Sequence, residues 1–384
     1  MTQHAEFYRN AIDLNRYSNS VTRRIVRAYN DVIIDATDRL RLLDPDSISA
    51  ARLRAILAQL KESLNTWAGS SSLMMAEELQ GLAILQADFM VDQLERMVPP
   101  SITTPIRSVE ISPQFAQAVV TSDPTQLGIV SLSDDLPGAV RRQFVMTVAD
   151  GTTLTLPNGE VVRKAFQSMS TSQAELFSQA VRNGLLTGES MPSIVRRLKG
   201  RLVRDDRSSV AQQIQKGGAV TARANNQIRA IVRSSITQVT DAAREQVALS
   251  NPDATTRYIY RAVLDSRTTP ICRSLDGKVY KWGEGPVPPL HFGCRSLRAP
   301  LIKGLEKEQI EEFEDYGSWL QQNPAEKQKV FGSKAPYFDY LANKYGAKDA
   351  LRRFVSKDGS ELTLNQLTAR YPDVKPRTTS SPGQ

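Results

Sequence analysis

Residues 263–300 read VLDSRTTPICRSLDGKVYKWGEGPVPPLHFGCRSLRAP, and they decide what kind of module the second half of the chain forms. Residues 256–264 lead into this stretch, and their alternating side chains predict a β-strand. Asp276-Gly277 is typical of a tight turn, and residues 278–282 after it have the pattern of a second short strand. The stretch therefore predicts a short β-hairpin whose strands are joined by a loop and a turn.

The best ligands for a soft metal ion gather in this stretch, although the chain has only two cysteines and two histidines. Cys272 lies in the loop of the hairpin, and His291 and Cys294 follow a proline-rich segment on one short turn. A His-x-x-Cys pair supplies two Zn²⁺ ligands from one turn, and Cys272 arrives from across the hairpin. A tetrahedral site needs a fourth ligand, for which Asp265 and Asp276 are the nearest candidates. One interpretation is therefore a structural zinc site.

Two other interpretations of the same residues stay open. In the first, Cys272 and Cys294 are buried thiols that pack beside a hydrogen-bonded His291, because free cysteine packs like a small apolar residue. In the second they form a disulfide outside the reducing interior of the cell. Catalysis is not expected: no helix N-terminus is evident to lower a thiol pKa, and no acidic cluster is present to hold a hydrolytic metal. We therefore predict that the chain is not an enzyme.

Composition narrows the class of protein and of partner. The chain has 384 residues, 40% of them hydrophobic and 23% charged, which is typical of a folded protein of two or three domains. Its formal net charge of +8 favours a partner with negative charge, such as DNA or an acidic protein surface. The sequence contains no apolar run long enough to span a membrane and begins with no secretory signal, so we expect synthesis in the cytoplasm.

The first part of the chain predicts helices. Apolar residues recur at helical spacing over residues 5–43, 48–67 and 71–98, so residues 1–98 are expected to form an antiparallel helical unit. Residues 99–168 are expected to form a linker with a small β-hairpin. Its turns are Asp150-Gly151 and Asn158-Gly159, because both dipeptides supply the positive φ of tight hairpin turns.

The remainder predicts a mainly helical α+β domain over residues 169–302, an extension over residues 303–370 and a disordered tail over residues 371–384. Helices are expected from Thr171 to Gly184, after Gly188, and over 221–249. Arginines are dense in this region and give either a solvated helix face or a surface that contacts DNA phosphates. The candidates for DNA contact are Arg196, Arg197, Arg201 and Arg204.

The runs LDSRTTPICRSLDGKVY (264–280) and PPLHFGCRS (288–296) resemble the C-terminal signature of the phage Mu F-like head-morphogenesis family. Residues 318–367 are similar to an extension found in many of these proteins. Many relatives carry further cysteines at two positions where this chain has Leu275 and Ser296. Beside the metal-ligand candidates, the motif residues of the signature are Arg267, Thr268, Gly277, Pro288, Pro289 and Arg295.

The resemblance implies a minor protein of the phage capsid that acts in head morphogenesis at the portal vertex or in the head interior. Its partners are then the portal protein and other head proteins, its location is the virion, and it is made in the host cytoplasm. Two alternatives remain: a DNA-binding internal protein that is ejected with the phage DNA, and a zinc-dependent nuclease centred on His291.

Overall fold

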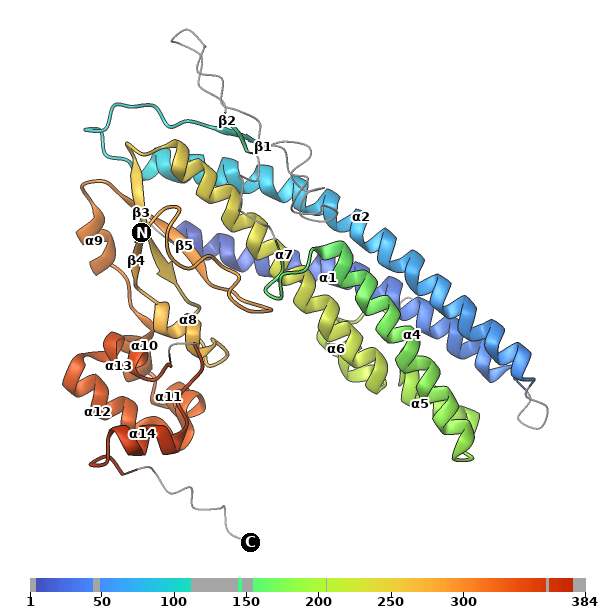
Figure 1. Cartoon of the computed structure of the whole chain (residues 1–384). Helices are drawn as coiled ribbons and strands as arrows, with labels where there is room; N and C mark the ends of the chain where they lie inside the picture. Colours follow the sequence, from blue (N-terminus) through green and yellow to red (C-terminus); the bar gives the residue numbers. More distant parts are fainter. Residues whose placement is uncertain are drawn as a thin grey trace.

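The structure, a computed structural model, is a long helical bundle with a small β-sheet at one end and a group of short helices beside that sheet (Figure 1). A mainly helical α+β fold is thereby confirmed. The described residues are 5–43, 49–111, 155–204, 206–356 and 359–375, together with the backbone of 144–146. Among the helices of these residues, none combines the length and the apolar character that a membrane span requires.

Four long helices form the bundle and lie side by side along most of their length (Figure 1). They are α1 (Ala5–Arg41), α2 (Ala50–Met97), α4 (Val162–Leu186) and α7 (Ala219–Ser250). Two shorter helices, α5 (Met191–Lys199) and α6 (Val210–Lys216), connect α4 to α7. Apolar side chains spaced three or four residues apart face the interior, as Ile25, Tyr29 and Ile33 of α1 do. The helix expected over 221–249 is confirmed as α7.

Helix α2 is continuous over 48 residues, so the prediction of two separate helices, 48–67 and 71–98, was wrong. The predicted break falls next to the small residues from Gly69 to Ser72. Trp67 and Ser72, however, are buried between neighbouring helices, where Trp67 Nε1 donates to the carbonyl of Ile25 (3.2 Å). The Ser72 hydroxyl donates to Ala68 O within its own helix (2.8 Å). Packing against α1 and α4 thus overrides the low helix propensity of the small residues.

The segment before α4 also differs from expectation. Phe144–Met146 (β2) is a strand, but it pairs in parallel with Val109–Ile111 (β1), not with a hairpin partner. Asn158-Gly159 makes a turn with a φ of 81° at the glycine, and the chain then enters α4 at Val162, well before the predicted start at Thr171. Phe166 stacks edge-on against Trp67 at 5.5 Å, and this contact favours the earlier helix. The expected Asp150-Gly151 turn lies outside the described residues.

The sheet has the order β4-β3-β5 and is antiparallel throughout. Its strands are β3 (Thr255–Arg261), β4 (Val279–Lys281) and β5 (Leu297–Ile302). The two strands expected from the sequence are confirmed as β3 and β4. The predicted loop around Cys272 was wrong, because residues Pro270–Leu275 form a short helix, α8. Proline is common in the first turn of a helix, because the backbone N–H groups there have no acceptor within the helix and proline therefore sacrifices no hydrogen bond.

The C-terminal helices enclose a second apolar core that is separate from the bundle core. They are α10 (Tyr316–Gln322), α11 (Pro324–Phe331), α12 (Ala335–Tyr345), α13 (Ala347–Arg353) and α14 (Leu364–Arg370), preceded by α9 (Glu306–Glu311). Val374 is 9% exposed and packs on this core, so the beginning of the predicted disordered tail is ordered. The later residues of that tail, 376–384, lie outside the described residues.

Candidate metal centre

Helix α8 places Cys272 next to strand β3. Thr269 precedes the helix and Pro270 begins it, so Cys272 lies in its first turn. This corrects the expectation that no helix N-terminus lies near the thiol. Gly277, with a φ of 70°, closes the turn after the helix, and its N–H donates to Tyr260 O of β3 (2.8 Å). A residue with a Cβ would be strained in this left-handed conformation.

A second turn carries His291 and Cys294, as the sequence predicts. It follows a cis peptide bond between Pro288 and Pro289, and the Cys294 N–H donates to His291 O (3.1 Å). Helix α7 holds the turn at two points. The Ser234 hydroxyl accepts the N–H of the intervening glycine (3.1 Å), and the Thr237 hydroxyl donates to Cys294 O (3.2 Å). The turn with His291 and Cys294, called the ligand turn below, is therefore fixed to a long helix of the bundle.

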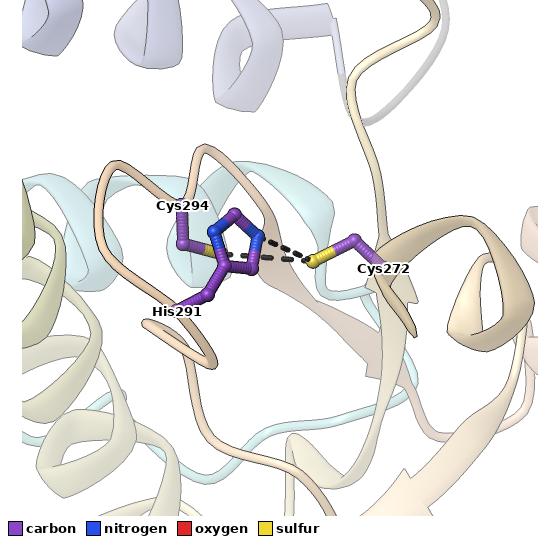
Figure 2. A group of neighbouring side chains, drawn as sticks. All are labelled: Cys272, His291 and Cys294. Carbon is purple, nitrogen blue, oxygen red and sulfur yellow. Dashed lines mark hydrogen bonds between the residues drawn. The ribbon is translucent and has the colours of Figure 1, made fainter. Parts of the chain in front are cut away.

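The three side chains converge (Figure 2). Cys272 Sγ lies 3.3 Å from His291 Nε2 and 3.8 Å from Cys294 Sγ, and the three ligand atoms lie within 4.8 Å of one another. The two cysteines are 2% and 0% exposed, whereas His291 is half-buried. A disulfide needs a sulfur–sulfur distance of about 2.05 Å, so the thiols of this structure are not bonded to each other.

The hydrogen bonds of the cluster make the two cysteines chemically unequal. The Cys294 thiol, followed by His291, stabilises the charged form of Cys272 and lowers its pKa to about 3. The same contact and burial raise the pKa of Cys294. Cys272 in turn raises the pKa of His291, against the effect of burial. Cys272 is thus the cysteine of the pair that loses its proton more readily, and the thiolate is the form in which sulfur binds a metal ion.

Neither aspartate that we considered as a fourth ligand joins the cluster. Asp265 accepts two hydrogen bonds from Arg295, of 2.6 and 2.7 Å. Burial alone would raise the pKa of Asp265, but Arg295 lowers it to about 2. Asp276 is buried and accepts the backbone N–H groups of Ala262 and Tyr316, both at 2.8 Å. Burial raises the pKa of Asp276 although Arg261 lies 3.7 Å away.

The other motif residues shape the turn that Asp265 begins. The Arg267 N–H donates to Asp265 Oδ1 (3.0 Å), while the Arg267 side chain is 82% exposed. The Thr268 hydroxyl donates to the carbonyl of Val263 at the end of the strand. Asp265 therefore receives donors from its own turn and from Arg295 on the ligand turn, which ties the two turns together.

Sequence reasoning missed a buried arginine behind the sheet. Arg298 of β5 lies between Asp241 and Glu245 of α7, with an Nε–Oδ1 distance of 3.0 Å to the former and an Nη1–Oε1 distance of 2.8 Å to the latter. Its guanidinium also stacks on Tyr258 at 4.9 Å. Burial acts to lower the pKa of Arg298, but the two carboxylates raise it. Acidic residues four positions apart on an apolar helix face were the available signal.

The arginines proposed for DNA contact lie far from this centre, on α5 and the segment after it (Figure 1). All four side chains are exposed. Arg197 is engaged by Glu189 (2.9 Å) and by Ala180 O (2.6 Å). Among the residues that the structure describes, no acidic side chain forms an ion pair with Arg196, Arg201 or Arg204.

Comparison with known proteins relates part of the chain to a protein family. Residues 175–298 match the family described as phage Mu protein F like protein, which covers about a third of the chain. The matched part begins within α4 and ends within β5, so it includes α7, α8 and all three ligands of the candidate metal centre. No curated protein and no solved structure matches the chain.

Proposed function

Since residues 175–298 assign the chain to the phage Mu F-like family, we propose that it is a minor protein of a phage head. It acts in head morphogenesis at the portal vertex or in the head interior and remains in the virion. The family match is the observation that supports this role. Recovery of the chain in purified proheads tests it.

The surface of α2 supports a contact with another head protein. Leu73, Ile84 and Leu85 are 62%, 43% and 65% exposed, although large apolar side chains of this kind are usually buried. Leu73 and Ile84 are separated by about three helical turns and therefore lie on the same face of α2. In this proposal the helical bundle supplies the surface that contacts another head protein. The Mu F-like module, residues 175–298, includes the β-sheet at one end of the bundle.

The exposed arginines favour a second candidate function, an internal virion protein that binds DNA. Arg196, Arg201 and Arg204 present guanidinium groups to solvent without an acidic partner among the described residues. Guanidinium groups form strong paired hydrogen bonds with phosphates. This function is compatible with the first, because a protein of the head interior meets packaged DNA.

We propose a non-catalytic role for the Cys–His cluster. A nuclease needs a metal-bound water in reach of a phosphate and carboxylates to hold a hydrolytic metal. Cys272 and Cys294 are buried, and the carboxylates of Asp265 and Asp276 are engaged elsewhere. A nuclease centred on His291 predicts metal-dependent DNA cleavage that His291→Ala abolishes, whereas our proposal predicts no cleavage by either protein.

A further inference from the structure

We propose that Cys272, His291 and Cys294 bind one Zn²⁺ ion, with a solvent molecule as the fourth ligand, and that this ion fastens the C-terminal helices to the Mu F-like module. The inference does not depend on the role of the protein in the phage head. It rests on the distances, the hydrogen bonds and the position of the three ligands.

The distances fit a tetrahedral metal site. With Zn–S bonds of about 2.3 Å and a Zn–N bond of about 2.0 Å, a tetrahedron separates two sulfurs by about 3.8 Å and a sulfur from a nitrogen by about 3.5 Å. The observed separations are 3.8 Å between the sulfurs and 3.3 Å between Cys272 Sγ and His291 Nε2. All three ligand atoms lie within 4.8 Å of one another, so side-chain movements on the order of an ångström would seat the ion.

The hydrogen bond on the far side of the ring prepares His291 for a metal ion. His291 Nδ1 lies 3.0 Å from the carbonyl oxygen of Phe292. A carbonyl oxygen only accepts, so Nδ1 carries a proton, and Nε2 is the nitrogen that would bind a metal after giving up any proton that it donates to Cys272. Nε2 is also the nitrogen that faces Cys272. The Thr269 hydroxyl lies 2.9 Å from Nε2 and would turn away when the ion binds.

Charge balance favours a divalent ion. Both thiols would lose their protons when a metal binds, and two buried thiolates without a counter-charge are costly in an apolar environment. Arg295, the nearest basic residue in the sequence, is engaged by Asp265. One Zn²⁺ neutralises two thiolates, and a neutral His291 adds no charge. The ligand set is therefore matched to a divalent ion that binds sulfur and imidazole.

The position of the centre indicates what the ion does. Cys272 and Cys294 are members of the second core, together with Tyr316 and Phe338 of the C-terminal helices. Helix α8 and the turn after it also contact the C-terminal segment directly, through the ion pair of Arg273 with Glu361, which lies between α13 and α14, and a hydrogen bond from Lys348 of α13 to Gly277 O (2.6 Å). An ion that joins α8 to the ligand turn would therefore hold the surface on which the C-terminal helices rest.

The test uses the full-length protein. Elemental analysis is expected to find one zinc per chain. Co²⁺ substitution is expected to give a thiolate charge-transfer band and the visible bands of tetrahedral cobalt. His291→Ala and Cys294→Ser should each lower Zn²⁺ affinity at least tenfold, whereas Thr269→Val should keep the metal. If the cluster is only a hydrogen-bonded packing unit, Thr269→Val disturbs it and no protein binds zinc.

Removal of the metal provides a second measurement that needs no variant. A chelator should increase the rate at which a protease cuts within residues 303–375, and added Zn²⁺ should restore the original rate. Wild-type protein that contains no zinc and gives no charge-transfer band with Co²⁺ would overturn the proposal, and so would a cutting rate that a chelator leaves unchanged. Neither result bears on whether the chain enters phage heads.

Discussion

Asp265 and Arg295 form a two-point ion pair, with Nη1–Oδ2 and Nη2–Oδ1 distances of 2.6 and 2.7 Å. Asp265 follows the sheet strand β3, and Arg295 directly follows Cys294. The pair therefore links the turn that leaves the sheet to the turn that carries two candidate ligands. Asp265 acts here as an anchor of the ligand turn and not as a ligand.

Asp265→Asn should lower the free energy of unfolding at neutral pH by about 1–2 kcal/mol, because the paired hydrogen bonds of a partly buried ion pair are lost. Urea denaturation measures the effect. Asp253→Asn is the matched control, since that side chain is exposed and should change stability by less than about 0.5 kcal/mol. If the two substitutions lower the free energy of unfolding equally, Asp265 does not anchor the ligand turn.

The same pair predicts a dependence on pH. The pKa of Asp265 is lowered to about 2, below the ordinary value of about 3.9 for aspartate. A group whose pKa is lowered by folding stabilises the folded state above its ordinary pKa, and this contribution is lost as the pH falls toward the folded value. The stability difference between wild type and Asp265→Asn should therefore shrink as the pH falls from about 4 to about 2. A difference that stays constant over this range would contradict the assignment.

Arg298→Met should destabilise the protein by about 3–5 kcal/mol, because it leaves Asp241 and Glu245 as unpaired buried carboxylates. Thermal or urea unfolding measures the loss. Adding Asp241→Asn and Glu245→Gln to the variant should recover part of it, since the unpaired charges are then removed. No recovery in the triple variant would mean that packing of the guanidinium, and not its charge, is what stabilises the sheet on α7.

The apolar face of α2 gives a prediction about assembly. A double variant, Leu73→Glu with Ile84→Glu, should fold normally because both side chains are exposed, yet it should enter proheads less than the wild type. Leu186→Glu is the control, since Leu186 is 85% exposed but lies on α4. Quantitative mass spectrometry of purified proheads measures the three proteins. Incorporation that is unchanged in the double variant would exclude this face as the contact surface.

The proposed DNA binding should be strongly dependent on salt. Replacing the four candidate arginines by glutamine should weaken binding at low salt by at least tenfold and reduce the slope of affinity against salt concentration. A fluorescence anisotropy titration with duplex DNA measures both quantities. Binding that survives the substitutions places the DNA-contacting surface elsewhere. The control replaces four exposed basic residues at the sheet end of the molecule, Arg257, Lys281, Lys303 and Lys307.

Local sequence patterns predicted the parts of the fold that local interactions determine. Helix α7 follows from the periodic spacing of its apolar residues, and the turn with Cys294 follows from the spacing of its ligands. These features need no knowledge of distant segments.

The features that the sequence did not predict depend on contacts between distant segments. Helix α2 continues through Gly69 because α1 and α4 pack against it on both sides. Arg298 is buried because two carboxylates of α7 meet β5; the spacing of Asp241 and Glu245 marks a helix face but does not reveal the strand that packs on it. Asp265 has the chemistry of a metal ligand, and only the position of Arg295 shows that it is engaged elsewhere.

The most direct test of the proposed function is to measure the chain in phage particles. Proheads are purified from cells that make the head proteins of the phage, and quantitative mass spectrometry determines the ratio of this chain to the major capsid protein. If the chain is a minor head protein, every preparation should contain it, at a small fraction of the amount of the capsid protein. Washing the particles with salt should not remove it. Its absence from particles while it accumulates in the cell extract would contradict the account.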